Sequence, residues 1–225
     1  MRKFKFLFVI ALAMLCLVGC GKSDKKNTDS KLAKAKEAMV SSLKNYSYDV
    51  EMTANMGFMD VSTEMNCKSD NVNQIVYCTS DTMGVETEQY IDYKNKVDYS
   101  KVTSAYGYGN SDWTKTKLDS NVSNSWLDMS DYIFNLTEES KNGGTYYKGT
   151  IDSKKLAKAM SQADSSTNYD DVISGDIDIE VFINSSNYIE TMNFTMEVMG
   201  ISEYVEITFK DFNTSGSITI PSSVK

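Results

Sequence analysis

The chain has 225 residues, with 23 basic and 31 acidic side chains and a net charge of −8. Such an acidic balance disfavours binding to nucleic acid and to other polyanions. Because the chain contains no histidine, imidazole acid–base catalysis, histidine-based triads and most zinc sites are excluded.

The first 19 residues have the organisation of a secretory signal peptide. Residues 1–5 carry three basic side chains, and residues 6–18 form an unbroken apolar run. Spanning a bilayer takes about 20 apolar residues, so this shorter run has the length of a signal-peptide core. The run ends at the tetrapeptide LVGC, residues 17–20, which resembles the lipobox of bacterial lipoproteins. That resemblance implies cleavage before Cys20 and attachment of diacylglycerol to its sulfur, with or without an additional N-acyl chain such as palmitate.

An uncleaved membrane anchor, with Cys20 as an ordinary thiol, is the alternative. A basic start, a short apolar core and a small residue before the cysteine coincide here, which favours the lipoprotein. Two acyl chains hold a protein stably on a membrane, since each buried methylene contributes about 0.8 kcal/mol. We therefore expect an extracytoplasmic protein that its N-terminal lipid anchors to the cell membrane. Residues 20–30 are polar and form the expected flexible tether, and residues 31–225 form a single domain.

The mature chain would carry 20 basic and 31 acidic residues, a net charge of −11. The only arginine of the chain, Arg2, leaves with the signal peptide. The domain therefore has no guanidinium group for bidentate binding of phosphate or carboxylate, and phosphate-centred chemistry is disfavoured.

The pattern after the tether predicts a helix followed by a meander of strands. Asp29 and Ser30 are candidate N-caps of a helix that we expect to end near Asn45. Its apolar stripe consists of Leu32, Ala35, Met39, Leu43 and Tyr46. From residue 46 to 58 every second residue is apolar or small, the repeat of a strand with one buried face. Turn residues separate the shorter strands that we expect at 60–68, 74–83, 85–93 and 96–103.

The second half begins with a short strand near Trp113 and a predicted second helical segment. Its expected apolar face consists of residues that alternate in spacing between four and three positions, which places them on one side of a helix: Val122, Trp126, Met129, Ile133 and Leu136. A strand at 145–151 then leads to a short helix with Ser153 as its expected N-cap and an inward face formed by Leu156, Ala159, Met160 and Ala163. Residues 163–174 are polar and are predicted to form a loop. The final strands are expected at 176–183, 188–198, 203–212 and 217–220.

After loss of Cys16 with the signal and acylation of Cys20, two cysteines remain. In an exported protein, Cys67 and Cys78 are expected to form a disulfide. They lie in adjacent predicted strands on either side of a polar turn near residues 69–74, and an antiparallel register centred there places them opposite each other. A redox-active pair is the alternative, but no CxxC spacing supports it.

This order of elements, together with five short segments, resembles the LolA-like lipoprotein-carrier superfamily, which includes the LppX-type lipoproteins. The segments are QYIDY at 89–93, DWTK at 112–115, YKGTID at 147–152, FKDFN at 209–213 and ITIP at 218–221. The resemblance implies an α+β fold: a large curved antiparallel sheet, or incomplete β-barrel, with helices packed on its concave face. It also implies a hydrophobic ligand on that face. The lipobox departs from LolA itself, which is a soluble carrier, and agrees with the LppX-type branch.

Two further motifs are interpreted as chance matches. Ser41-x-x-Lys44 and the triplet at 69–71 match two motifs of penicillin-recognising serine enzymes, but the K-T-G element is absent. Residues 164–170 alternate like a calcium loop, but Tyr169 occupies the position of the turn glycine and Gly175 that of the bidentate glutamate. No catalytic residue, metal site or cofactor is therefore predicted, beyond the lipid on Cys20, and we do not expect an enzyme.

Several methionine and aromatic side chains are candidates for lining a hydrophobic-ligand pocket, because such residues can line adaptable apolar sites. They are Tyr48, Met52, Met56, Trp126, Met129, Phe194 and Met196. The leading hypothesis is a membrane-anchored extracytoplasmic lipoprotein that binds or carries a lipid or other hydrophobic ligand without catalysis. The alternative is a structural or interaction lipoprotein of the cell envelope, with a filled core and an envelope protein as its partner. Neither involves nucleic acid.

Overall fold

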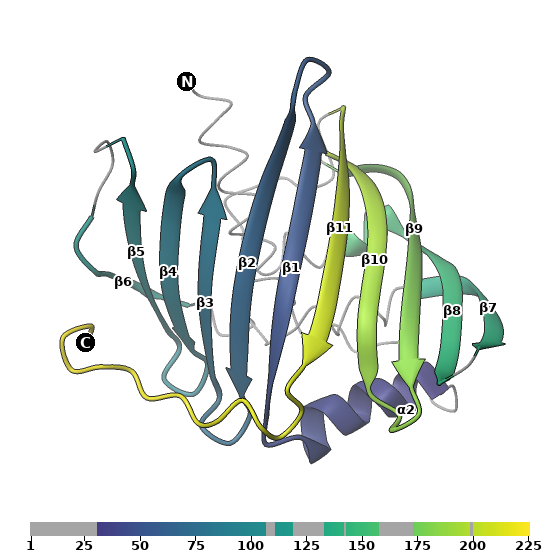
Figure 1. The fold of residues 1–225 in the computed structure, drawn as a ribbon, viewed down its shortest axis with the longest axis horizontal. Helices are drawn as coiled ribbons and strands as arrows, with labels where there is room; N and C mark the ends of the chain where they lie inside the picture. The colour runs from purple at the N-terminus through teal and green to yellow at the C-terminus, as the bar shows by residue number, and fades with distance from the viewer. Residues whose placement is uncertain (1–30, 107–110, 119–132, 142, 158–172, 199) are drawn as a thin grey trace.

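The computed structural model describes residues 31–106, 111–118, 133–141, 143–157, 173–198 and 200–225. They form one open, curved sheet of antiparallel strands, with a helical segment packed at one end of one face (Figure 1). The 11 strands are ordered β6-β5-β4-β3-β2-β1-β11-β10-β9-β8-β7. The first strand therefore lies in the middle of the sheet and joins an N-terminal meander to a C-terminal one. The predicted α+β fold with a large, incompletely closed antiparallel sheet is confirmed.

The strand bounds agree with the predicted meander, since both ends of β1 to β5 lie within a few residues of the expected positions. In the N-terminal half the strands are β1 (Asn45–Asn55), β2 (Asp60–Asp70), β3 (Ile75–Thr82), β4 (Val85–Asp92), β5 (Val97–Ser104) and β6 (Thr114–Lys117). In the C-terminal half they are β7 (Ile133–Lys141), β8 (Gly144–Ile151), β9 (Ile173–Asn184), β10 (Ile189–Val198) and β11 (Ile201–Lys210).

The N-terminal helix α2 (Lys31–Glu37) continues as one π-helical turn, η1 (Ala38–Ser42). It ends about three residues earlier than expected, because Leu43 already has extended backbone angles. The side-chain amide of Asn71 donates to the carbonyls of Met39 and Leu43 at 3.0 and 2.9 Å, which satisfies acceptors that a helix end leaves free. The predicted apolar stripe is confirmed, since Leu32, Ala35, Met39, Leu43 and Tyr46 are all buried. Among the described residues, no helix combines the length and the apolar character needed to cross a bilayer.

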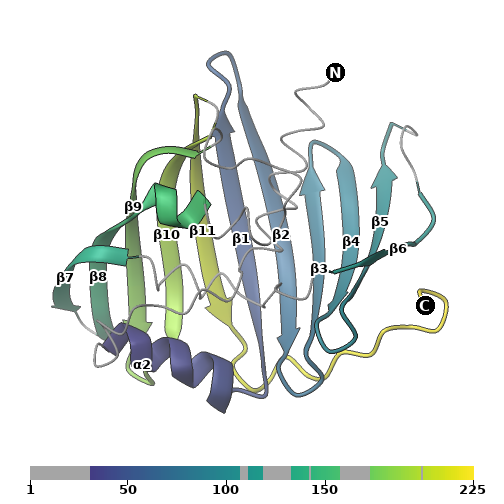
Figure 2. The same ribbon diagram turned by 180° about the vertical axis from the view of Figure 1, so that it is seen from behind.

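The sheet has two faces, which we call the inner and the outer face. The inner face carries α2 and the helical turn at 153–157, and Figure 2 shows it toward the viewer. Because side chains alternate along a strand, the even-numbered residues of β1 from Tyr46 to Ala54 point inward, and all are buried. The main hydrophobic core lies between this face and α2, with Phe194, Phe209, Met39 and Met192 among its most buried side chains.

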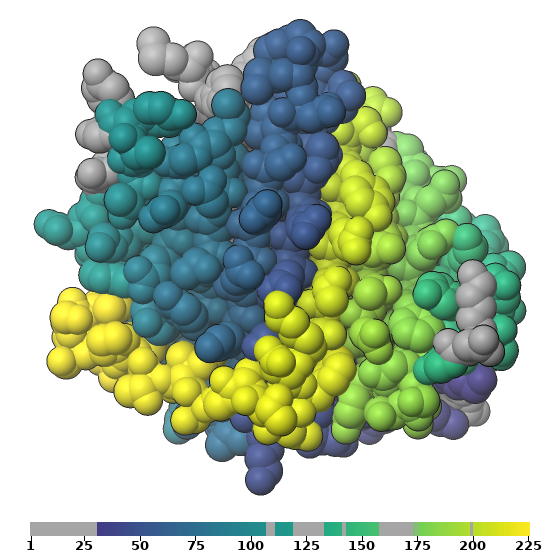
Figure 3. Space-filling view, in the orientation of Figure 1, coloured from purple at the N-terminus to yellow at the C-terminus, as the bar shows by residue number. Residues whose placement is uncertain are grey.

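The segment expected as a final strand at 217–220 is not a strand in the structure. It runs in extended form across the lower outer face, as Figures 1 and 3 show, where Ile218 and Ile220 pack with Tyr90 and Tyr99 in a second apolar cluster. Instead of pairing with a strand, the Ile218 N–H donates to the buried carboxylate of Asp70 at 2.9 Å.

Asp70 ties the end of the chain to the turn between β2 and β3. Its two carboxylate oxygens also accept the backbone and side-chain N–H groups of Asn73 at 2.9 and 2.7 Å. Burial opposes ionisation, but the hydrogen bonds from Asn73, Ile218 and Val72 outweigh it and lower the pKa of Asp70. The SDN triplet at 69–71 therefore acts in a turn, which agrees with its interpretation as a chance match.

The prediction of a second helical segment is wrong for its last residues. Residues 119–132, with Val122, Trp126 and Met129, lie outside the described residues, but Ile133 and Leu136 belong to strand β7. There Ile133 pairs with Ile151 of β8, and both are buried. A Cβ on Gly149 would lie 2.6 Å from Ile133 Cγ2, so glycine permits this close approach of the two strands. Sheet pairing thus overrides the helical spacing of these residues.

The short helix after β8 begins as predicted, but its N-cap is Asp152 rather than Ser153. The Asp152 carboxylate accepts the Lys155 N–H at 3.1 Å, and its carbonyl accepts the Leu156 N–H at 3.0 Å, the pattern of an N-cap. Leu156 is buried as expected; Ala159, Met160 and Ala163 lie outside the described residues. The predicted end of the loop at residue 174 is too late, because strand β9 already begins at Ile173.

The predicted disulfide between Cys67 and Cys78 is confirmed. The two residues are direct partners in the β2–β3 register, with Cα atoms 4.2 Å apart, and both are buried on the inner face. A bridge that closes so short a loop contributes about 2–3 kcal/mol by the chain-entropy estimate.

Candidate functional site

The inner face of the sheet is apolar over its C-terminal half and its centre. From β8 across to β1, the inward side chains are almost all aliphatic, aromatic or methionine, and each central strand contributes them by two-residue alternation. The side chains buried there include Ile151, Ile177, Ile179, Val181, Met192, Phe194, Val205, Ile207 and Val50. A continuous apolar wall of this kind is suited to a hydrophobic ligand or to a packed core.

Four of the predicted pocket residues lie on this wall. Met52 and Phe194 both pair with Val205, from opposite sides of β11, so the register brings them close to one another. Met196 lies one inward position further along β10. Tyr48 contacts Phe209, with ring centroids 5.7 Å apart. All four are at most 7% exposed.

The other predicted site residues are not part of this group. Met56 lies beyond the end of β1, half-buried in the turn to β2, where its N–H donates to the Met59 carbonyl at 2.9 Å. Trp126 and Met129 lie outside the described residues, as does the expected lipidation site Cys20.

A carboxyl group interrupts the apolar wall. Glu203 of β11 points inward between Ala54 of β1 and Met196 of β10, is 5% exposed, and is not paired with a lysine or a hydrogen-bond donor of the described residues. Because burial disfavours the charged form, the pKa of Glu203 is raised to about 7. At neutral pH the inner face therefore holds a carboxyl group close to its titration midpoint.

We expect Glu203→Gln to increase the free energy of unfolding by about 1–3 kcal/mol at pH 8, since each unit of pKa shift corresponds to about 1.4 kcal/mol. Between the ordinary glutamate pKa of 4.5 and the native value of about 7, the folded state keeps a proton that the unfolded chain releases. Wild-type stability therefore falls as the pH rises through this window. Near pH 5 the wild type and Glu203→Gln should differ little.

Urea unfolding at pH 5 and pH 8 measures this difference. Glu197→Gln is the matched control, since Glu197 is exposed on the neighbouring strand β10. An equal effect of both substitutions at pH 8 would contradict the assignment of a buried, destabilising carboxyl group to Glu203.

The N-terminal half of the inner face is more polar. Its inward positions on β3 to β5 include Ser80, Thr82, Thr87, Gln89, Asp98 and Ser100. Gln89 Nε2 donates to Asp98 Oδ1 at 3.0 Å. Burial raises the pKa of Asp98, although the hydrogen bond from Gln89 lowers it in part.

Two acceptors in this half are buried without a partner. Gln89 is 1% exposed and Thr87 is 4% exposed, and neither Gln89 Oε1 nor Thr87 Oγ1 makes a hydrogen bond within the described structure. An unsatisfied buried polar atom costs about 1–3 kcal/mol, and native proteins contain few of them. These residues were not predicted from the sequence, although a signal was present: Thr87 and Gln89 share the alternating phase of Val85 and Ile91.

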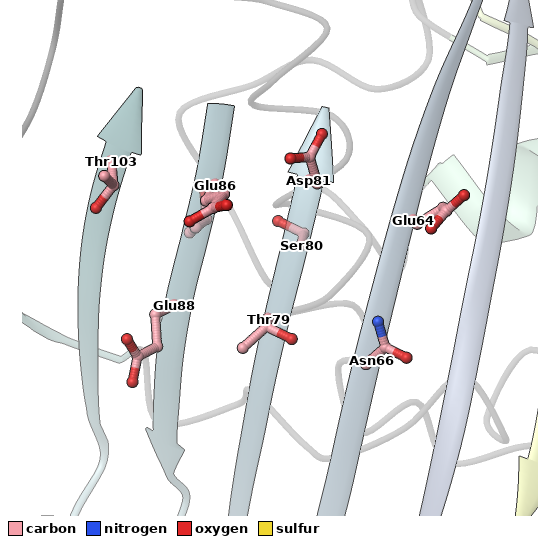
Figure 4. A pocket seen from close by; sticks show the side chains of 9 residues that line it. Glu64, Asn66, Thr79, Ser80, Asp81, Glu86, Glu88 and Thr103 are labelled. Carbon is pink, nitrogen blue, oxygen red and sulfur yellow. The ribbon is translucent and has the colours of Figure 1, made fainter. Parts of the chain in front are cut away.

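The outer face carries a depression of a different character. It has a volume of about 240 Å³ over β2 to β5 and is lined by the outward-facing residues Glu64, Asn66, Thr79, Asp81, Glu86, Glu88 and Thr103 (Figure 4). Ser80 and Thr87 of the same strands also line it, although the strand register assigns their side chains to the inner face. Its labelled side chains are polar, and four of them are carboxylates. Among the described residues no three potential ligand side chains are placed to hold a metal ion. This depression therefore offers neither an apolar lining nor a cation site, and the inner face is the better candidate.

No known family profile matches the chain, and no curated protein matches it by sequence. Solved structures do match. The Mycobacterium tuberculosis lipoprotein LppX is 14% identical with a TM-score of 0.49, over 84% of this chain and 98% of that one. A LolA superfamily protein from Nitrosomonas europaea is 10% identical with a TM-score of 0.34, over 88% and 96%. The likeness is one of fold. At these identities the ligand and the mode of action have to be argued from the residues.

Proposed function

We propose that this chain is a membrane-anchored, extracytoplasmic binding protein that holds a lipid or other hydrophobic ligand on the inner face of its sheet, without covalent chemistry. The observation that carries the proposal is the apolar wall from β8 to β1, with Met52, Phe194 and Met196 at its centre. Burial of ligand surface there would provide about 25 cal/mol per Å² of apolar area. The lipobox at residues 17–20 supports the location, because lipid on Cys20 would keep the domain at a membrane that supplies such ligands.

Co-purification tests this proposal. The mature chain is purified without its acyl anchor, extracted with organic solvent, and the extract is analysed by mass spectrometry. We expect a bound hydrophobic molecule in amounts approaching one per protein, and binding of Nile red after its removal. Absence of any co-purifying lipid, together with no Nile red binding by the extracted protein, would contradict the proposal.

A second candidate, an interaction protein of the cell envelope, is favoured by a different observation. Several large apolar side chains are exposed in turns at one end of the sheet: Phe58 is 81% exposed, Tyr106 69% and Met83 44%. They follow β1, β5 and β3, the strands whose arrowheads point to the same end in Figure 1. Large apolar side chains exposed at the same end of a sheet can contribute to a contact surface. The lipid-free result described above would leave this candidate ahead.

A further inference from the structure

The inner face is amphipathic, and its polar part is continuous with its apolar wall. One row of paired residues runs across five strands from Gln89 through Cys78, Cys67 and Tyr48 to Phe209. A second row runs beside it from Thr87 through Ser80, Met65 and Val50 to Ile207. At 4.7–4.9 Å per strand, each row covers about 19 Å, the scale of an acyl chain. A single amphiphile lying along a row would meet the polar side chains of β4 and β3 at one end and, apart from the Tyr48 hydroxyl, apolar side chains and the disulfide beyond them.

The buried polar end offers acceptors rather than positive charge. Asp98 accepts the Gln89 Nε2–H group, so the amide is oriented with Oε1 free to accept. Thr87 Oγ1 lies two residues along the same strand and is likewise unpartnered among the described residues. Both side chains are more than nine-tenths buried. Because such atoms are shielded from water, a ligand hydroxyl that reaches them forms a hydrogen bond with little competition from solvent.

The charges near Gln89 and Thr87 disfavour an anionic head. At the inward positions of the described strands, the ionisable carboxyl groups are Asp98, Glu138 and Glu203, and no lysine occupies such a position. Glu138 is paired with Lys31 of α2 at 2.8 Å. Arg2, the only arginine in the chain, lies in the leader. Beside Gln89, a phosphate, sulfate or carboxylate head would therefore lie near the Asp98 carboxyl group, with no lysine at an inward strand position to neutralise it.

We propose that the inner face selects an uncharged amphiphile with a hydroxyl-bearing head. The hydroxyls of the head would donate to Gln89 Oε1 and Thr87 Oγ1, and the apolar chain would lie along the rows toward Phe209 and Ile207. This inference rests on the proposed function, because it requires the inner face to hold a hydrophobic ligand. It adds the chemistry of the head and the two residues that recognise it.

Three probes with the same 12-carbon acyl chain test the selection: monolauroylglycerol, with two free hydroxyls; methyl laurate, with no donor; and laurate, an anion. The mature chain 20–225 carrying Cys20→Ala, which keeps every described residue, is used in a Nile red displacement assay. We expect monolauroylglycerol to bind at least threefold more tightly than either of the other two. Equal affinity for all three, or tightest binding of laurate, would overturn the inference while the proposed function stands. Failure of Nile red and of every probe to bind would overturn both.

Substitutions test whether Gln89 and Thr87 bind the head of the ligand. Gln89→Leu and Thr87→Val each remove one acceptor and should weaken monolauroylglycerol binding about three- to tenfold, the range of a single hydrogen bond, without changing methyl laurate binding. Thr195→Val is the matched control, since Thr195 is exposed on the outer side of β10, and it should leave all three affinities unchanged. Thr87→Val is nearly isosteric, so it keeps the test valid if Gln89→Leu does not fold. Unchanged monolauroylglycerol affinity in the folded acceptor variants would show that these residues do not bind the head.

Discussion

Cys20→Ala is expected to abolish retention of the protein on the membrane and incorporation of fatty acid. The substitution removes the sulfur on which the proposed anchor depends, and without acyl chains the acidic domain has little attraction to a membrane that carries negative lipids. Since each buried methylene contributes about 0.8 kcal/mol, two chains provide stable anchoring and their loss allows release. The variant should accumulate either as released protein or as uncleaved precursor.

Metabolic labelling with an alkyne-tagged palmitate, followed by membrane fractionation, measures this effect. Cys16→Ala is the matched control, because Cys16 lies in the apolar leader upstream of the expected cleavage position. It should label and fractionate as the wild type does. Unchanged labelling of Cys20→Ala would refute the lipoprotein assignment, whatever the domain binds.

Phe194→Ala should lower the free energy of unfolding by about 3–5 kcal/mol, the range for loss of a large side chain from a packed core. Phe194 is 2% exposed at the centre of the inner face, between Val205 of β11 and Ile179 of β9. The surrounding strands are held by hydrogen bonds on both sides and have little freedom to collapse into the space that the ring leaves.

Phe182→Ala on the adjacent strand β9 provides the control for this measurement. Phe182 points to the outer face, is half-buried, and contacts Tyr146 with ring centroids 4.5 Å apart. Its loss should cost about 1–2 kcal/mol, because fewer of its atoms are removed from water. Urea unfolding of both variants at the same pH gives the comparison. Similar losses for the two would mean that the inner face around Phe194 is not the packed wall described above.

Most of the sheet could be predicted because its strands obey local alternation. The inward series Tyr46, Tyr48, Val50 and Met52 is visible as a two-residue repeat, and turn residues mark where each hairpin of the first meander reverses. The register that joins Cys67 to Cys78 follows from the same turn. These features depend on residues close together in the chain, so a single sequence contains enough information to infer them.

The secondary-structure predictions were wrong where the local residue pattern favoured one structure and contacts with residues far along the chain favoured another. Ile133 and Leu136 have helical spacing, but pairing with Ile151 across β7 and β8 places them in a strand. Residues 217–220 alternate like a strand, but Ile218 and Ile220 pack in the cluster with Tyr90 and Tyr99. The Ile218 N–H donates to Asp70 rather than to a neighbouring strand. Tertiary contacts decided both cases, because the hydrogen bonds that define a strand come from elsewhere in the chain.

By itself, the sequence determined the composition and the local order of this protein: an apolar run at residues 6–18 shortly before Cys20, the absence of histidine, and the succession of helix and hairpins. Only the tertiary structure decided that β1 joins β11, so that the two meanders form one sheet. It also decided that Gln89, Thr87 and Glu203 share a buried face with Phe194. The physical reason is that burial and pairing are properties of the whole sheet: a polar residue in an alternating strand is exposed or buried according to what packs against that face.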